Sequence, residues 1–310
     1  MRIAVIDLGT NTFNLLIAET GENGIYSILM NEKLPVKLGA GGIEKRIITP
    51  EAADRGINAL EQHKKTIDKF GTDQIHAFAT SAIRSADNGK EYAERIRKEV
   101  GISIEIITGE KEAELIFKGI SQSVPLGDEK VLVLDIGGGS NELIIGNQNK
   151  IYWKRSFNLG IARLLERFEP SDPITQSEIN LVESFLETEL SSLFEAVREH
   201  QPSTLVGASG SFDTFHSMIK MTTPEAVKNI SPSAVSIDMQ SFDDLHARLI
   251  VSTIEERKQM KGLEPMRIEM IVLAAIFTKF TMQKCSIQQF IQSDYALKEG
   301  VIKDLIVSYT

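Results

Sequence analysis

The most regular hydrophobic pattern in the chain occurs twice. Residues 3–18 read IAVIDLGTNTFNLLIA, and residues 131–146 read VLVLDIGGGSNELIIG, with no gap between the two copies. In each copy an apolar run ends in Asp-x-Gly, a small polar loop follows, and a second apolar run begins. Short apolar runs of this kind are typical of buried strands. Each copy therefore predicts a strand, a loop and a second strand, with Asp7 equivalent to Asp135.

Turn-rich stretches follow both copies, at residues 20–24 and 146–150. Strand-like runs then resume, at Ile25 in the first copy and at residues 151–157 in the second. Each copy thus predicts a three-stranded meander. A Rossmann or Walker loop leads from a strand into a helix. The polar loops here lead back into a strand, which separates this chain from both of those classes.

Helical periodicity fills most of the remaining sequence. Thr49-Pro50-Glu51 combines an N-cap, a proline at the first helical position and an acidic first turn. Thr175 to Glu178 is a capping box, and the helix that it opens is expected to run to about His200. Further helices are predicted at 91–100, 110–120 and through most of the C-terminal third, and strands at 102–108 and 289–292. Residues 75–83 are predicted to be a strand with its exit loop, and residues 204–215 a strand, a Gly/Ser turn and the start of a helix.

Length and turn content indicate two domains. The chain has 310 residues, and the stretch SVPLGDEK at 123–130 is the natural bridge between two halves. We place the first domain at residues 1–122 and the second at residues 123–310. Mixed strands and helices in both halves predict an α/β fold.

Composition excludes several classes of protein. The longest apolar run, residues 270–277, is far shorter than the roughly 20 residues that cross a bilayer, and no signal-type segment precedes the first strand. The single cysteine, Cys285, fits a reducing compartment, so we expect a cytoplasmic protein without membrane contact. The net charge of −9 argues against nucleic-acid binding. A polyanionic substrate would need local cations.

The two polar loops are candidate anion sites. Glycine after the aspartate lets backbone N–H groups approach an anion closely, and the small polar residues add donors. A single Asp-x-Gly turn is common in proteins that bind no anion there. Two copies in register favour an anion-binding role. The candidate phosphate-binding residues of these loops are Gly9, Thr10, Asn11, Thr12, Gly137, Gly138, Gly139 and Ser140.

Three carboxylates suggest a hard cation. Asp7, Asp135 and Glu142 could hold Mg²⁺ (or Mn²⁺) together with water and substrate phosphates. The five histidines show no ligand spacing, so a zinc site is not expected. The turn at 207–213 lacks the second glycine of a serine-nucleophile elbow. Its Gly210 either contacts the ligand or simply joins a strand to a helix.

Five segments carry a resemblance to a known family, in the family's order: DLGTNT at 7–12, ATSAIRSADN at 79–88, ITGEKEAELIFKGI at 107–120, DIGGGSNEL at 135–143 and SDYALKEG at 293–300. With them, essentially the whole chain resembles the exopolyphosphatase/guanosine pentaphosphate phosphatase family, in its short form. That family belongs to the superfamily of actin, Hsp70-type ATPases and sugar kinases. The resemblance implies two actin-like (ribonuclease H-like) lobes, each a mixed sheet with flanking helices, and a cleft between them.

The resemblance also implies residue roles. Glu112 matches the family's catalytic base, Arg84 matches an arginine near the bound phosphate, and Asp7, Asp135 and Glu142 match acids associated with Mg²⁺. Three departures from the family pattern are present: Lys111 replaces a glutamate, residues 209–211 read SGS instead of GGT, and residues 267–269 read RIE instead of RxD. The short form lacks the helical domain that helps long members hold polymers, which implies a shorter substrate.

From these observations we expect a hydrolase that releases terminal phosphate from inorganic polyphosphate by attack of water on a phosphoanhydride. The alternatives are removal of the 5′ phosphate of guanosine pentaphosphate, an ATP-dependent kinase of the same superfold, and a nonenzymatic nucleotide sensor. The expected partner is the polyphosphate or guanosine pentaphosphate substrate, with neither nucleic acid nor membrane, and a homodimer is the candidate assembly.

Overall fold

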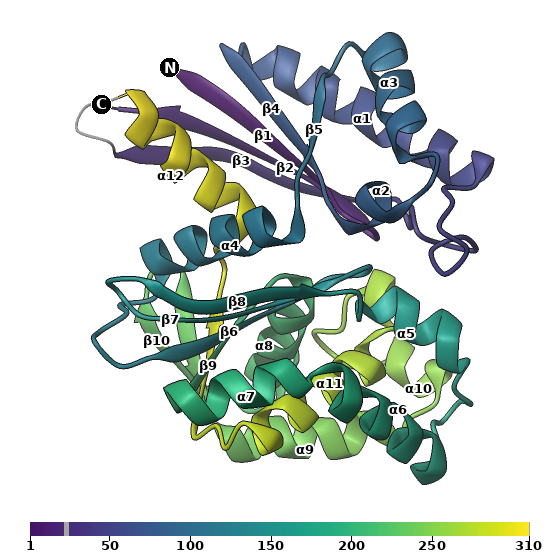
Figure 1. The fold of residues 1–310 in the computed structure, drawn as a ribbon, viewed down its shortest axis with the longest axis vertical. Helices are drawn as coiled ribbons and strands as arrows, with labels where there is room; N and C mark the ends of the chain where they lie inside the picture. Colours follow the sequence, from purple (N-terminus) through teal and green to yellow (C-terminus); the bar gives the residue numbers. More distant parts are fainter. Residues whose placement is uncertain (22–24, 310) are drawn as a thin grey trace.

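Two mixed sheets form the centres of two lobes that lie one above the other (Figure 1). The computed structural model describes residues 1–21 and 25–309; residues 22–24 of the first predicted turn lie outside this description. The first sheet has the order β3-β2-β1-β4-β5. Its strands are β1 (Arg2–Leu8), β2 (Thr12–Thr20), β3 (Tyr26–Pro35), β4 (Gln74–Ala79) and β5 (Ile104–Ile106).

The second sheet has the order β10-β11-β12-β9-β6-β7-β8. Its strands are β6 (Val131–Ile136), β7 (Asn141–Gly146), β8 (Ile151–Phe157), β9 (Thr204–Ala208), β10 (Val227–Ser231), β11 (Ala234–Ile237) and β12 (Gln289–Ser293). Both predicted meanders are present as antiparallel strands, β1-β2-β3 and β6-β7-β8. In each, the first strand also pairs in parallel with a later one, β4 or β9.

Helices cover both faces of each sheet. The first lobe carries α1 (Pro50–Phe70), α2 (Ser81–Ser85) and α3 (Gly89–Val100). The second carries α5 (Ile161–Phe168), α6 (Gln176–Glu189), α7 (Ser191–His200), α8 (Gly210–Thr222), α9 (Met239–Ile250), α10 (Ile254–Lys258), α11 (Ile271–Lys284) and two short 3₁₀ turns, Pro224–Ala226 and Pro265–Arg267. Within the described residues, no helix combines the length and apolar character that crossing a bilayer requires.

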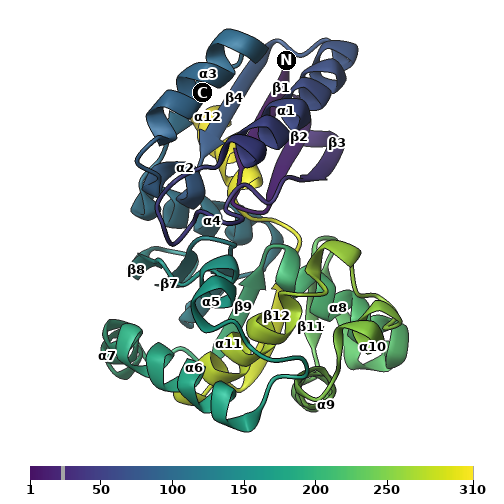
Figure 2. The ribbon, with the colours of Figure 1, turned by 90° about the vertical axis from the view of Figure 1, so that its right-hand side faces the viewer.

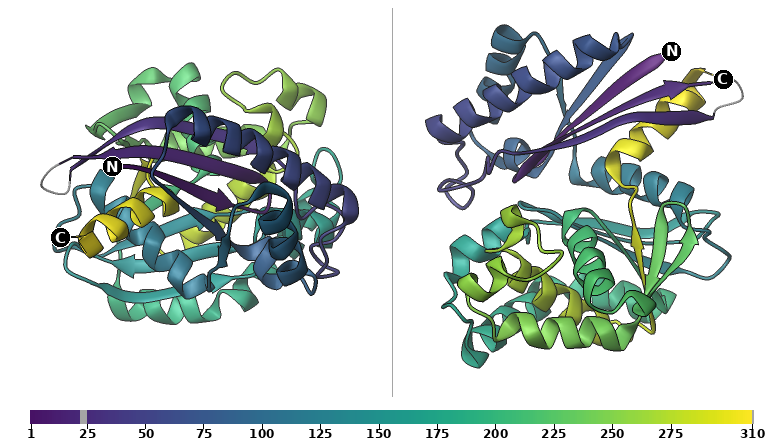
Figure 3. Two further views of the ribbon diagram at one scale, coloured as in Figure 1. Left: turned by 90° about the horizontal axis from the view of Figure 1, so that it is seen from above. Right: turned by 180° about the vertical axis from the view of Figure 1, so that it is seen from behind.

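A middle layer separates the two sheets. It consists of α4 (Gly109–Ser123) and α12 (Leu297–Tyr309), and its apolar cluster contains side chains from both sheets. The chain passes from β12 in the second lobe to α12, which runs along β1 and β2 (Figure 3). The two helices cross where a Cβ on Gly300 would lie 1.8 Å from the Leu115 carbonyl oxygen, so only glycine permits this approach. The division at residue 122 stays a prediction.

The structure corrects two sequence predictions. The helix expected from Thr175 to about His200 is two helices, because Leu190 leaves the helical region with φ −90° and ψ 12°. The hairpin of β10 and β11 was predicted as helix. Its outer strand, VKNIS, is half-buried or exposed and mostly polar, so it lacks the alternating apolar pattern from which a strand is recognised.

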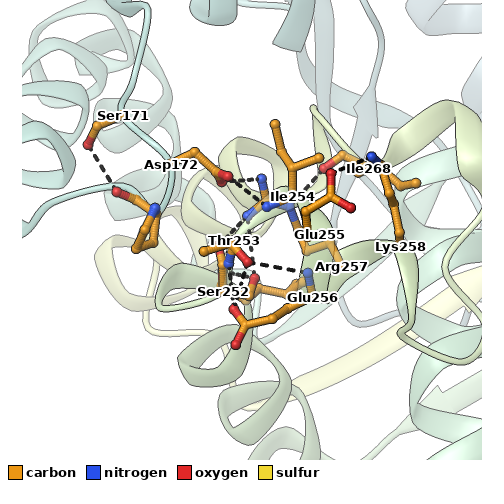
Figure 4. A network of polar contacts seen from close by, with 12 residues as sticks. Ser171, Asp172, Ser252, Thr253, Ile254, Glu255, Glu256, Arg257, Lys258 and Ile268 are labelled. Carbon is orange, nitrogen blue, oxygen red and sulfur yellow. Dashed lines mark hydrogen bonds and ion pairs between the residues drawn. The ribbon is translucent and has the colours of Figure 1, made fainter.

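A polar network anchors the loop that follows α10 (Figure 4). The buried guanidinium of Arg257 donates to the Ile268 carbonyl at 3.0 Å through Nε and to Asp172 at 2.8 Å through Nη2. The N–H of Ile254 donates to the second oxygen of Asp172 at 2.7 Å. These bonds fix the segment that carries Arg267, a residue of the cleft described next.

Candidate active site

A cavity of about 530 Å³ lies between the two lobes. Both hairpin loops line it, one from each sheet, as the internal repeat predicted. The residues of the sequence prediction that line it are Asp7, Gly9, Thr10, Asn11, Thr12, Glu112, Asp135, Gly137, Gly138, Ser140, Glu142 and Gly210. Two others, Arg84 and Gly139, lie immediately behind this lining, where they contact Ser140 and Ser81, respectively.

The two hairpins turn in the same way. Gly9 donates its N–H to the Thr12 carbonyl at 3.1 Å, and Gly137 donates to the Ser140 carbonyl at 3.1 Å. A Cβ at either glycine would lie within 3 Å of the same carbonyl oxygen that accepts the bond. The glycine of each Asp-x-Gly motif is therefore required by the close approach of the turn.

Helix α5 supports the second loop from behind. The carbonyl groups of Gly137, Gly138 and Gly139 accept hydrogen bonds from Ile161 N, Ala162 N and Arg163 Nε at 2.8–3.0 Å. Gly160 packs so tightly against this loop that a Cβ would lie 2.4 Å from the backbone of Gly138. With its carbonyls held on the α5 side, the loop is immobilised and its amide groups are left for the cleft.

Each hairpin aspartate is held through one oxygen. Asn14 donates to Asp7 Oδ2 at 3.0 Å, and Ser209 donates to Asp135 Oδ2 at 2.6 Å. Removal from bulk water raises the pKa of Asp7 to about 6, although Lys298 opposes the shift. Burial, reinforced by repulsion from Glu142, raises the pKa of Asp135 to about 7. Both carboxylates are thus poorly compensated when charged.

Glu142 is the most deeply buried of the three acids, at 1% exposure. Its Oε1 accepts hydrogen bonds from Ser140 at 2.7 Å and Ser156 at 2.6 Å. Burial raises the pKa of Glu142 despite these bonds. Its position on β7 directly opposite Asp135 explains why its charge opposes ionisation of Asp135.

The three acids fit a cation that is held only partly by protein. In the described part of the chain, no three His, Cys, Asp or Glu side chains gather closely enough to hold a metal ion by themselves. Asp7, Asp135 and Glu142 nevertheless line one cavity, and after burial the charges of Glu142 and Asp7 further raise the pKa of Asp135. Mg²⁺ commonly binds through one or two carboxylates, waters and substrate phosphates. Hard oxygen donors with unbalanced negative charge suit that mode of binding.

Glu112 and Arg84 form a pair beside the second loop. Arg84 Nη1 donates to Glu112 Oε2 at 2.7 Å and to the Ile107 carbonyl at 3.1 Å, and its Nη2 lies 3.5 Å from Ser140 Oγ. Glu112 is 7% exposed and lines the cavity. Burial raises its pKa well above the ordinary value, with a further contribution from Glu142, while Arg84 opposes the shift.

The acidic neighbours of Glu112 on α4 do not share its buried environment. Glu110 is exposed, and Glu114 pairs with Lys154 of β8. Thr108 caps α4 by accepting a hydrogen bond from the Lys111 N–H, which fixes the first turn on which Glu112 lies. Burial therefore distinguishes Glu112 from the other acids of an otherwise acidic helix.

Sequence reasoning assigned no role to several polar residues of the cleft. The hydroxyl of Ser81 is buried without a partner among the described residues and lines the cavity. Asn14 and Ser209 hold the two aspartates. Ser81 follows Thr80 at the start of α2, within the segment ATSAIR, so that segment was the available signal. Asn14 could have been found from its equivalence to Glu142 in the repeat.

Three cations also line the cleft, from both lobes. Lys33 of β3 pairs with Asp213 at 2.6 Å, Lys298 of α12 donates to Asn31 at 3.2 Å, and Arg267 lies against Gly210. A Cβ at Gly210 would lie 1.6 Å from Arg267 Nη2. These residues provide the local positive charge that an acidic protein needs if its ligand is an anion.

Comparison with known proteins agrees with this geometry. The model of the Ppx/GppA phosphatase family matches residues 16–308. Exopolyphosphatase 1 of Mycobacterium tuberculosis (strain ATCC 25618 / H37Rv) is 28% identical over 304 residues, covering 97% of this chain and 87% of that protein. The Mycobacterium leprae protein of the same name is also 28% identical, covering 97% and 88%, respectively.

Solved structures show the same architecture over the whole chain. An exopolyphosphatase from Cytophaga hutchinsonii has a TM-score of 0.95 and 38% identity, covering 99% of this chain and 98% of that one. The Aquifex aeolicus Ppx/GppA family member has a TM-score of 0.79 and 28% identity, covering 100% and 99%. The predicted α/β fold class, with two lobes that each contain a mixed sheet and flanking helices, is confirmed, and the chain belongs to the Ppx/GppA phosphatase family.

Proposed function

We propose that this protein is an exopolyphosphatase, which removes terminal phosphate from inorganic polyphosphate by attack of water on the last phosphoanhydride. The observation that carries the proposal is the position of Glu112, a buried carboxylate with a raised pKa that faces a cavity lined by two glycine-containing anion loops. The relatives named exopolyphosphatase support the choice of substrate.

Glu112 is suited to act as general base. A carboxylate whose pKa is raised toward the working pH accepts a proton more readily than an ordinary surface glutamate. Arg84 holds Oε2 of Glu112, and this contact fixes the carboxylate relative to Ser140 and the second loop. In the proposed step the water oxygen bonds to the terminal phosphorus, its proton passes to Glu112, and the bond to the bridging oxygen breaks.

The loops would bind the terminal phosphoryl group. Because α5 holds the carbonyls of the second loop, the loop would offer an anion its N–H groups, including that of the cavity-lining Gly138. The hydroxyl of Ser81, which has no partner among the residues that the structure describes, adds a donor beside them. When bound at Asp7, Asp135 and Glu142, Mg²⁺ would neutralise charge that develops on the phosphate oxygens.

The distribution of charge suggests the direction of the polymer. Glu112 is paired with Arg84, and it lines the same cavity as three cations, Lys33, Lys298 and Arg267. We place the terminal phosphate beside Glu112 and the following phosphates along these cations. Electrostatic positioning of this kind supplies most of the rate in phosphoryl transfer.

Glu112→Gln tests the proposal. We expect tripolyphosphate binding, measured calorimetrically, to stay within a few fold of wild type, and phosphate release to fall by about 10²- to 10⁴-fold, because glutamine cannot accept the proton. Glu110→Gln is the matched control on the same helix, and it should retain wild-type activity because Glu110 is exposed. Equal activity in the two variants would exclude Glu112 as the base.

Substrate choice needs a direct comparison. Phosphate release should be measured side by side from short polyphosphate, long polyphosphate and guanosine pentaphosphate, with Mg²⁺ present. We expect the highest kcat/KM with polyphosphate. A preference for guanosine pentaphosphate would overturn the choice of substrate but leave the proposed base in place.

A further inference from the structure

Arg163 of α5 joins the two lobes behind the cleft. Its side chain comes from the second lobe, where α5 lies beneath the first lobe (Figure 2), and the residue is 9% exposed. Nε donates to the Gly139 carbonyl at 2.8 Å and Nη2 to Ser85 Oγ at 2.8 Å. Nη1 donates to the Ile43 carbonyl at 2.9 Å and lies 3.3 Å from Glu44 Oε1. All three nitrogens are therefore engaged.

Each partner of Arg163 is part of, or connected to, a segment that lines the cleft. Gly139 is part of the second anion loop, and Ser85 directly follows Arg84, the partner of Glu112. Ile43 lies in the loop after β3, and the start of that loop is bonded to the first hairpin. There, Val36 N and Gly39 N donate to the carbonyls of Asn11 and Thr10 at 2.8 and 3.2 Å.

Glu166 strengthens the same contact from one turn further along α5. Its Oε1 accepts the Gly41 N–H at 2.8 Å and its Oε2 the Glu44 N–H at 3.4 Å. Residues three apart on a helix lie on one face. Arg163 therefore holds a carbonyl of this loop while Glu166 holds its amides. We call these two residues and their contacts with the first lobe the α5 clasp.

We propose that Arg163 is a positioning residue that sets the separation of the two anion loops and the placement of Arg84 relative to Glu112. It is buried behind the loops, so it acts through Gly139, Ser85 and Ile43 and not by contact with substrate. Charge-assisted hydrogen bonds are shorter and stronger than neutral ones, so a single guanidinium with four acceptors defines this spacing well. The kinetic part of the test rests on the proposed hydrolase activity, whereas the structural part does not.

The structural test measures the distance between the lobes. Spin labels are attached to cysteines introduced by Gln62→Cys on α1 and Thr188→Cys on α6, and pulsed electron paramagnetic resonance measures the distance between them. The buried Cys285 stays unlabelled. We expect Arg163→Gln to broaden and lengthen the distance distribution, and Arg163→Lys to have an intermediate effect. The matched control is Arg167→Gln on the same helix, because Arg167 is exposed and stacks on Phe185 within the second lobe. An unchanged distribution in Arg163→Gln would overturn the proposal.

The kinetic test separates positioning from simple bracing. We expect Arg163→Gln to lower kcat/KM for polyphosphate by about 10- to 100-fold per folded molecule, with partial recovery in Arg163→Lys and no change in Arg167→Gln. If Arg163→Gln lowers Tm but leaves the rate unchanged, Arg163 only stabilises the fold, and the proposal is overturned. Should Arg163→Gln fail to fold, Ser85→Ala and Glu166→Gln take its place, and wild-type distances and rates in both would overturn it. If the parent protein hydrolyses no polyphosphate, the proposed function fails while the distance measurement still decides the role of the clasp.

Discussion

The two hairpins have the same backbone but different chemistry. In the first, Asp7 faces Asn14 across the strands; in the second, Asp135 faces Glu142 at the equivalent register position. The amide of Asn14 donates to Asp7, whereas the carboxylate of Glu142 repels Asp135. Burial raises both pKa values: that of Asp7 reaches about 6, opposed by Lys298 and Asn14, and that of Asp135 reaches about 7, reinforced by Glu142. Duplication thus preserved the turn, while one cross-strand residue made the second copy the more strongly negative.

The largest expected difference between the copies is at that cross-strand position. We expect Glu142→Gln to reduce phosphate release by about 10³-fold, because it removes a carboxylate from the proposed cation site. Asn14→Ala, which removes one hydrogen bond to Asp7, should cost only about 3- to 10-fold. Both are measured at saturating polyphosphate and Mg²⁺. Equal losses would show that the hairpins contribute alike.

The Mg²⁺ requirement of variants in the two hairpins should also differ. We expect Asp135→Asn to raise the Mg²⁺ concentration for half-maximal activity by at least about 10-fold, and Asp7→Asn to raise it less, since Asp135 shares its site with Glu142. Titration of activity with Mg²⁺ in each variant makes the comparison. Full activity in excess chelator would show that the reaction needs no divalent cation.

The smallest expected effect concerns stability and pH. The pKa of Asp135 in the folded protein, about 7, is above its ordinary value of 3.8, so the charged form destabilises the fold. The penalty is complete above about pH 7, declines as the pH falls, and is absent below about pH 3.8. We therefore expect Asp135→Asn to raise Tm by about 2 to 6 °C at pH 8, with the gain fading on acidification.

Asp7→Asn is the internal comparison for this measurement. Its gain at pH 8 should be smaller, because the pKa of Asp7 is raised only to about 6. A gain that persists at pH 4 in either variant would point to a cause other than ionisation. Melting curves followed by circular dichroism from pH 4 to pH 8 would distinguish ionisation from another cause.

The sequence was informative where the chemistry is local and duplicated. The ungapped repeat predicted both meanders, and both aspartates line one cavity. The pairing of Arg84 with Glu112 spans 28 residues, and nothing in local periodicity indicated which acid of α4 is buried. Only the family resemblance selected Glu112, and its role as base stays a prediction.

Contacts between the lobes were beyond sequence reasoning for a physical reason. Arg163 bonds to Ile43, 120 positions earlier, and to Ser85, 78 positions earlier. Such contacts depend on how two sheets pack across a middle layer, and no periodic pattern along the chain encodes that distance. The β10–β11 hairpin was missed for a different reason, because its outer strand has too few apolar residues to give a strand signal.

The middle layer has a consequence for folding. Its apolar cluster joins Ile3 and Val5 of the first strand to Val301 and Ile302 of the last helix. During synthesis the first lobe therefore lacks part of its core until nearly the entire chain has been made, and contacts of such high sequence separation are slow to form. The two lobes share this cluster, so we expect them to melt in one cooperative transition and an isolated first lobe to expose the sheet face that α12 covers.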